Sequence, residues 1–315
     1  MLKTFIRPAM ICIPFLIGWF FPQLAVLNAE PFNFVRIALM IMFFMSCLQI
    51  RMADLQIRRY HWYLLLSNLA MGLVPYFLLK LFLPQNPVLA EVAFFVGITP
   101  TATAAPVVIA FLHGRIGFAL TGFTITNVFI SLALLFLLPM VTGDVSFDFI
   151  YQVGKTIALV IAVPFAAAAL VKILYPQAAM WPKHCKTFSF SLWSFTLMVI
   201  AAIAHRHFIE NPDESKLQIL GVAVVSLVLC IGNFYFGKYL SPKRFRRETS
   251  QLLGQKNTTF TMYLALTYAG PLVAMGPIFY VLWHNTWNAY QMYQYDRRTF
   301  QRIQRREHPD AGELH

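Results

Sequence analysis

Long apolar runs recur along almost the whole chain, from Pro8 to Tyr295, and they constrain the fold more than any other feature. Hydrophobic residues make up 58% of the 315 residues, and charged residues only 12%. Soluble domains contain about twice that share of charged residues. The runs are continuous rather than alternating with period two, so they indicate helices that cross about 30 Å of hydrocarbon and not barrel strands. The sequence therefore predicts an all-α protein embedded in a lipid bilayer.

Ten segments have the length and composition of membrane spans, and they form one transmembrane domain over residues 1–296. They are expected at roughly residues 8–27, 33–50, 61–84, 90–112, 116–141, 149–174, 187–205, 217–239, 250–269 and 272–294. Of the 25 lysines and arginines, 18 lie in one alternate set of connections and termini, whereas the opposite set holds only Arg36, Arg206 and Lys216. Basic residues favour the cytoplasmic side. We therefore expect a multi-pass protein of the cell (plasma or inner) membrane, with both termini and a polar tail, residues 297–315, in the cytoplasm.

The net charge of +12 is not the mark of a nucleic-acid binder, because the basic residues sit in short connections as membrane topology requires. The four cysteines are scattered, without a CxxC pair or a neighbouring histidine, so neither a metal site nor a disulfide framework is expected. Paired carboxylates, an HExxH motif and a Ser/His/Asp arrangement are also missing from the predicted spans. An enzyme is therefore not expected.

The fourth predicted span is interrupted by Pro100 and Pro106 and carries three threonines, Thr99, Thr101 and Thr103. Proline lacks an amide donor and clashes with the preceding helical turn. Carbonyl groups freed in this way must face protein or a wet cavity rather than lipid. The sequence thus predicts a helix broken near mid-membrane, and a kinked packing helix is the alternative.

The ninth predicted span is interrupted by a polar run that contains Gly254, Gln255, Lys256, Asn257 and Thr258. A cation at this depth is costly and is usually functional. Spans four and nine hold the same position in the two halves of the chain, residues about 1–145 and 146–296. Interrupted polar segments in corresponding positions point to a transporter built from inverted repeats, and an odd number of spans per half inverts the second half.

Three further residues are candidates for the same site. Asn127 lies in the fifth span, where a buried amide needs partners, whereas the nearby Thr121 is expected to bond its own backbone. His284 and Asn285 in the last span either support the site or bond a neighbouring helix.

Four stretches together resemble the bile acid/sodium symporter family, the BASS-type transporters. Met42–Met45, followed by Arg51–Leu55, is similar to that family's second span and exit loop. Pro100–Pro106 falls where the family has Pro-Gly-Gly-Thr-Ala-Ser-Asn, and Gly254–Asn257 where it has Glu-x-Gly-x-Gln-Asn. Trp283–Asn285 matches a Trp-His-Asn in the last span. The four stretches occur in the family's order over nearly the whole chain.

The resemblance implies two inverted repeats of five spans, with unwound segments of spans four and nine crossing each other. It implies a core domain, formed by spans three to five and eight to ten, that moves against a panel of spans one, two, six and seven. It also implies uptake of organic anions, such as bile acids and other carboxylates, usually with sodium as the coupling ion.

The chain departs from this family at the sodium ligands. The family's sodium-binding glutamate corresponds to Leu252, and its glutamine corresponds to Lys256. Other ligand positions are occupied by Ala105, Pro106, Ala119 and Phe123, while Asn257, Thr103 and Gly254 match the family's pattern.

Lys256 changes the expected coupling. Like charges ~4 Å apart repel by about 4 kcal/mol at an effective dielectric of 20, so sodium beside a protonated Lys256 is disfavoured. Our hypothesis is that the ammonium group replaces a sodium ion and holds the carbonyl groups of the two unwound segments. Lys256 either releases its proton on one face and couples transport to protons, or stays charged in a uniporter or a direct anion binder. A lysine that packs or snorkels without function is the remaining alternative.

The expected function is therefore secondary-active transport of a small organic anion by alternating access. Half-helix N-termini and Lys256 favour a carboxylate solute. The alternative is a non-transporting membrane sensor or scaffold that has kept the transporter fold. No cofactor is expected, apart from the sodium that the resemblance makes possible.

Overall fold

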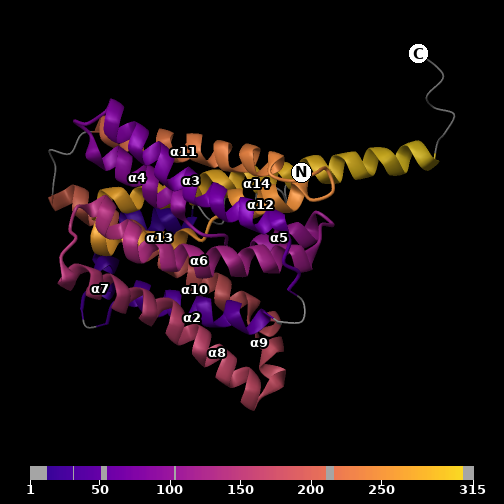
Figure 1. Cartoon of the computed structure of the whole chain (residues 1–315), viewed down its shortest axis with the longest axis horizontal. Coiled ribbons are helices and arrows are strands. Elements are labelled where there is room, and N and C mark those ends of the chain that lie inside the picture. Colours follow the sequence, from indigo (N-terminus) through magenta and orange to yellow (C-terminus); the bar gives the residue numbers. More distant parts are fainter. Residues whose placement is uncertain (1–12, 31, 51–54, 103, 211–215, 308–315) are drawn as a thin grey trace.

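The computed structural model describes residues 13–30, 32–50, 55–102, 104–210 and 216–307, and within them the chain folds into helices without a strand (Figure 1). Residues 13–20 are helical. The other elements are η1 (Pro22–Asn28), α2 (Phe34–Gln49), α3 (Arg59–Phe82), α4 (Pro87–Ile98), α5 (Ala105–Phe111), α6 (Ile116–Thr142), α7 (Phe147–Ile157), η3 (Ala158–Ala162), α8 (Val163–Leu174), η4 (Pro176–Met180), α9 (Trp181–His184), α10 (Lys186–Glu210), α11 (Lys216–Tyr239), α12 (Arg246–Gly254), α13 (Thr258–Tyr268) and α14 (Pro271–Glu307). Most helix ends lie within a few residues of the predicted segments.

Within the described residues, five helices are long and apolar enough to cross a membrane. They are α3, α6, the continuous segment Phe147–Leu174, residues Thr187–Glu210 of α10, and α11. Two shorter apolar helices, α2 and α4, accompany them. This composition agrees with an all-α membrane protein.

Local sequence explains two irregular places. The segment from α7 to α8 contains a widened π turn, η3, which ends two residues before Pro164. The missing N–H of this proline cannot continue the helical hydrogen-bond ladder. Between α13 and α14, Gly270 adopts φ 103°, which glycine tolerates without steric cost, and its N–H donates to the Ala265 carbonyl at 2.7 Å. Pro271 then starts α14, so this Gly-Pro dipeptide forms the turn between the two helices.

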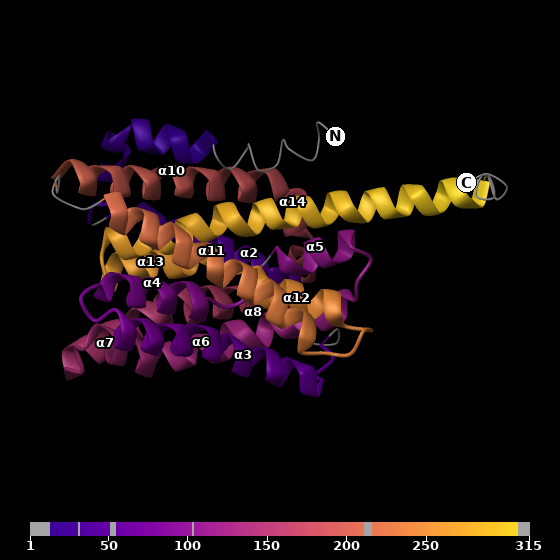
Figure 2. The ribbon, with the colours of Figure 1, turned by 90° about the horizontal axis from the view of Figure 1, so that it is seen from above.

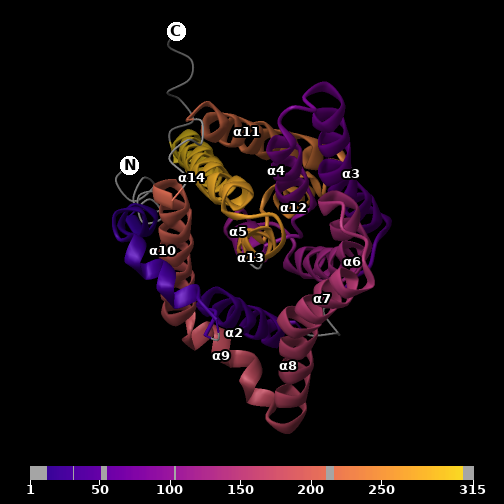
Figure 3. The ribbon, with the colours of Figure 1, turned by 90° about the vertical axis from the view of Figure 1, so that its left-hand side faces the viewer.

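The helices pack in two groups. In the first, η1 packs on α10, and α2 packs between α10 and α8. In the second, α3 packs on α4 and α6, and α11 packs on α4, α12 and α14. Figure 3 shows α10, α2 and α8 along one side of the molecule and the second group on the other, with α5 and α13 in the middle.

The two short helices α4 and α13 occupy the interior of the second group. Residues 92–98 of α4 and 258–265 of α13 are buried on every side. A helix without an exposed face belongs in the centre of a bundle. Both interrupted segments thus lead into the protein interior rather than toward lipid.

The last helix is longer than predicted. The tenth segment was expected to end near residue 294, but α14 continues to Glu307 and extends beyond the other helices (Figures 1 and 2). Arginine, glutamine and glutamate are good helix formers, and no proline occurs between residue 294 and Pro309. The first part of the predicted polar tail therefore continues the last helix.

Candidate functional site

Both predicted interruptions are present, and they adjoin. The fourth segment is divided between α4 and α5, and the ninth between α12 and α13. Thr101 and Lys256 form an antiparallel backbone bridge. The Ala102 N–H donates to the Gln255 carbonyl at 2.8 Å, and the Asn257 N–H donates to the Pro100 carbonyl at 2.7 Å. The backbone groups of each interruption, which lack partners in their own helix, are thus hydrogen-bonded to the backbone of the other interruption. We call this pair of strand-like segments, residues 99–102 and 255–257, the crossing.

The residues predicted to break the helices act in different ways. Pro100 lies in the crossing itself, just after the end of α4. Pro106 is the second residue of α5, a position where proline starts a helix and does not break it. At Gly254, the last residue of α12, a Cβ atom would lie 2.3 Å from the Phe234 ring, so close packing requires glycine there.

Lys256 is buried at the crossing, with 1% of its surface exposed. Its Nζ donates to Oδ1 of Asn68 on α3, and to the Gly97 carbonyl at 2.9 Å in the last turn of α4. Carbonyl groups at a helix C-terminus carry partial negative charge. Among the residues that the structure describes, no carboxylate pairs with Lys256. Neutral oxygens from two helices therefore hold the ammonium group.

Thr99, Thr101 and Asn127 tie the crossing to the helices around it. Thr101 Oγ1 donates to the Leu252 carbonyl at 2.6 Å. Thr99 Oγ1 donates to the Phe95 carbonyl at 2.6 Å and lies 2.8 Å from Thr261 Oγ1. Asn127 Nδ2 donates to the carbonyls of Thr101 and Phe123, both at 2.9 Å. These side chains hold the segments in place, and Thr103 lies outside the described residues.

One part of the crossing is accessible. Asn257 and Ala102 are partly exposed and Ala104 is exposed, whereas Gln255 and Thr258 are buried, at 3% and 4%. The Gln255 Oε1 atom is buried and has no hydrogen-bond partner. The accessible surface at the crossing is therefore formed by Asn257, Ala102 and the nearby Ala104.

In the described part of the chain, the hydrogen bonds of His284 and Asn285 stay within α14 and do not reach the crossing. Asn285 Nδ2 donates to the Val281 carbonyl of its own helix at 2.8 Å and lies 3.0 Å from His284 Nε2. The α14 residue that reaches the site is Tyr280, whose hydroxyl donates to the Gly254 carbonyl at 2.7 Å. Thr121 donates to the Gly117 carbonyl of its own helix, as predicted.

Sequence reasoning missed three residues around the site: Asn68, Asn233 and Tyr280. Asn233 is fully buried, and its Nδ2 donates to the Tyr280 hydroxyl at 3.3 Å. Asn68 and Asn233 are lone amides inside apolar segments, the same signal that identified Lys256. Tyr280 carried no such signal, because a tyrosine is ordinary in an apolar helix.

Two oxygens next to the crossing, of the kind that sodium binds, are already hydrogen-bonded to Lys256. The Gly97 carbonyl and Asn68 Oδ1, which are suitable hard oxygen ligands, already accept the ammonium group. Leu252 has no exposed surface and packs in an apolar cluster with Leu64 and Ala119. The described residues contain no group of three histidine, cysteine, aspartate or glutamate side chains placed to hold a metal ion.

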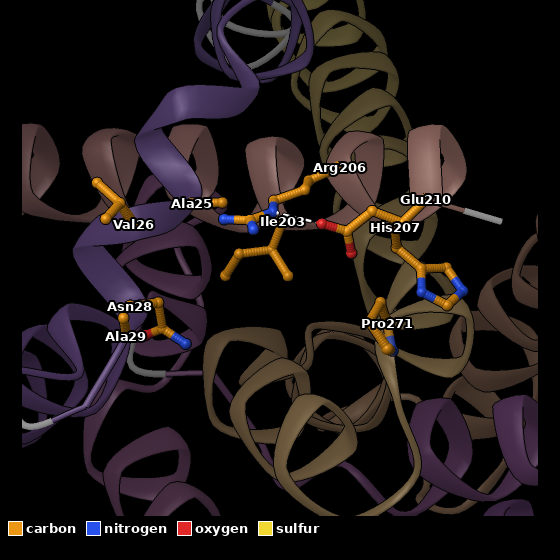
Figure 4. Close-up of a pocket in the computed structure, with 9 residues that line it drawn as sticks. All are labelled: Ala25, Val26, Asn28, Ala29, Ile203, Arg206, His207, Glu210 and Pro271. Atoms are coloured by element: carbon orange, nitrogen blue, oxygen red, sulfur yellow. Dashed lines mark hydrogen bonds and ion pairs between the residues drawn. The ribbon is translucent and has the colours of Figure 1, made fainter.

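A separate cavity of about 300 Å³ lies away from the crossing, between η1, α10 and the start of α14 (Figure 4). Its lining includes Arg206 and Glu210, whose Nε and Oε1 atoms are 2.7 Å apart. Both side chains are 56% exposed, so this pair contributes little to stability. None of the predicted site residues lines the cavity.

No protein-family model matches this chain, and no curated protein matches its sequence.

Proposed function

We propose that this chain is a secondary-active transporter that moves a small organic anion across the membrane by alternating access. The observation that carries the proposal is the crossing, where two interrupted helices meet inside the protein and a buried ammonium group joins them. Unwound backbone at membrane depth is tolerated only inside protein or beside a wet cavity. Discontinuous helices of this kind form the substrate and ion sites of many transporters.

In this proposal the ten predicted segments all cross the membrane as two inverted repeats. Two features support it. The segments at the crossing run antiparallel, as expected for corresponding parts of inverted halves. The two packing groups also contain the segments that the sequence resemblance assigns to a panel and a core. Labelling of single cysteines in the connections from either side of the membrane tests this topology and the cytoplasmic placement of both termini.

The proposed solute is a carboxylate. The accessible part of the crossing lies beside the N-terminus of α13, where the N–H groups of the first turn carry partial positive charge. Acidic side chains are absent from residues 255–258 and 99–102, so nothing there repels an anion. An organic anion would bind at Asn257 and the start of α13, with Lys256 supplying positive charge from behind.

The proposed role of Lys256 is to replace the coupling cation. Its ammonium group bridges the end of α4 and the interruption after α12, as a bound sodium ion would. If it releases its proton during the cycle, transport is coupled to protons; if it stays charged, the protein is a uniporter. A flat dependence of substrate binding on pH between about 6 and 9 would exclude coupling through this lysine.

A membrane sensor or scaffold is the second candidate. The two hydrogen bonds of Lys256 favour this candidate. They fix a positive charge at the crossing permanently, whereas an ion-coupled transporter must bind and release its ion in every cycle. Binding and uptake distinguish the candidates. We would screen organic carboxylates by thermal shift, with and without sodium, and then measure uptake and counterflow of the ligands found in proteoliposomes. Binding without saturable counterflow would support the sensor and overturn the transporter.

A further inference from the structure

Apart from Lys256, positive charge is also gathered around the ring of Phe245, at the end of the molecule predicted to face the cytoplasm. The guanidinium carbons of Arg58, Arg115 and Arg244 lie 5.4, 5.0 and 5.5 Å from the centroid of this ring. The ring is buried, with 4% of the residue exposed, whereas the three arginines are exposed. A single buried side chain therefore gathers three accessible positive charges.

Aromatic packing fixes the ring on which these arginines lie. Phe118 stacks on Phe245 with centroids 4.7 Å apart and an angle of 19° between planes. Tyr60 packs against the same ring at 5.9 Å. Because Phe118 covers one face, the arginines are left with the opposite face and the edges. Guanidinium groups stack favourably on aromatic rings, so this arrangement holds them close together despite their mutual repulsion.

The backbone adds to the positive potential. Arg58 directly precedes α3, Arg115 directly precedes α6, and Phe245 directly precedes α12. The N-termini of three helices therefore meet near the arginines. Helix N-termini carry partial positive charge, so they reinforce the potential of the cluster and do not neutralise it.

The described part of the chain supplies no counter-ion for the three guanidinium groups. Its ion pairs join Arg36 to Glu30 and Arg206 to Glu210, at other places. Among the described residues, the acidic Glu248 lies near the cluster; it is 3% exposed, and its Oε1 accepts the backbone N–H of Arg115 at 2.9 Å. That carboxylate bonds backbone and not a guanidinium group. The cluster is thus complementary to an anion from outside.

We propose that Arg58, Arg115 and Arg244 form a binding site for a phosphate group, carried either by an anionic phospholipid or by a solute. Planar guanidinium forks bind phosphate oxygens in pairs, which lysine cannot do. The site lies where positive connections would meet the anionic cytoplasmic leaflet. It is separate from the crossing, and it does not depend on the proposed transport function.

The experiment uses purified full-length protein in detergent micelles. Thermal unfolding is followed with added phosphatidylglycerol against phosphatidylcholine, and with inorganic phosphate against chloride at equal ionic strength. Three triple variants are compared with the wild type. The first variant changes all three arginines, Arg58, Arg115 and Arg244, to Gln, and the second changes them to Lys. The third, a matched control, changes Lys238, Lys243 and Arg297 to Gln.

If the ligand is a phospholipid, we expect phosphatidylglycerol to stabilise the wild type and inorganic phosphate to have no effect. If the ligand is a soluble phosphate compound, we expect inorganic phosphate to stabilise the wild type too. The Arg→Gln variant should lose at least about tenfold in apparent affinity, as expected when charge-assisted hydrogen bonds are removed. The Arg→Lys variant, which keeps the charge, should also bind more weakly, and it decides the matter if the Arg→Gln variant does not fold. The proposal is overturned if neither ligand stabilises the wild type beyond its reference, if the control variant loses as much affinity, or if the Arg→Lys variant binds as the wild type does.

Discussion

At the scale of single residues, Lys256 shows how this fold accommodates a buried charge without a carboxylate. Burial of an ammonium group is expensive unless hydrogen-bond acceptors replace its water. Here the acceptors are Asn68 Oδ1 and the Gly97 carbonyl, and the latter gains partial negative charge from its place at the end of α4. The lysine is therefore part of the packing of the crossing and also its main source of charge.

Replacing Lys256 by methionine should destabilise the protein. Methionine is similar in size, but it leaves the two oxygens unpaired, at about 1–3 kcal/mol each. We expect a clearly lower unfolding temperature in detergent for Lys256→Met. We also expect no stabilisation of the wild type by sodium relative to choline at equal ionic strength, since a bound ion would stabilise the folded state. A sodium-dependent rise in wild-type stability would contradict the assigned role of Lys256.

Replacing Asn68 by leucine tests the second partner. The ammonium group would keep only the Gly97 carbonyl, and a hydrogen bond to a charged group contributes about 1.5–3 kcal/mol. Asn285→Leu is the matched control, because Asn285 bonds the backbone of its own helix away from the crossing. Thermal unfolding of both variants measures the difference. Equal losses in the two variants would show that Asn68 has no special part in holding the lysine.

Sequence reasoning identified Lys256, Thr101 and Asn127, because polar residues stand out in apolar helices. It did not identify their partners. Hydropathy shows which residues are unusual for a membrane span, but partner choice depends on how helices far apart in the sequence pack. Asn68 and Lys256, for example, are 188 residues apart.

At the scale of elements, prolines and polar runs were sufficient to predict where helices end. Pro100 and the run at residues 254–258 mark the two interruptions, and α4 and α12 end there. The antiparallel contact between them is a long-range pairing, which helical periodicity does not encode. The position of both segments in corresponding places of the two halves was the only available signal for it.

The close approach of α3 and α4 provides a test at this scale. A Cβ atom on Gly97 would lie 1.9 Å from the Met71 carbonyl oxygen, so Gly97→Ala must separate the two helices that hold Lys256. Overpacking of this kind costs about 1–3 kcal/mol, and the unfolding temperature should fall.

Gly232→Ala in α11 is the control, because no atom lies within 4 Å of its added Cβ. Alanine there should stabilise the helix by roughly 0.5–1 kcal/mol. A harmless Gly97→Ala would mean that the two helices can separate without strain.

At the scale of the whole molecule, polar contacts join the second packing group to α7, which continues through η3 into α8 of the first group. One such contact is made by Tyr268 at the end of α13, whose hydroxyl donates to Thr156 Oγ1 at 2.7 Å and to the Gln152 carbonyl at 3.1 Å. Thr156 and Gln152 belong to α7. If the two groups move relative to each other during transport, as the proposed mechanism requires, this contact must break in one of the two states.

Tyr268→Phe should therefore shift the balance between the two states and leave the fold intact. Hydrogen bonds of this type contribute about 0.5–1.5 kcal/mol each, so the equilibrium should change by up to roughly tenfold. The measurement is the rate at which a cysteine at the exposed position Ala104 reacts with an impermeant maleimide, in a background without the four native cysteines.

Tyr76→Phe is the control, because the Tyr76 hydroxyl bonds the Val141 carbonyl within the second group. The Tyr268 variant should change the labelling rate, whereas the Tyr76 variant should not. Equal labelling in both variants and the wild type would argue against relative motion of the two groups.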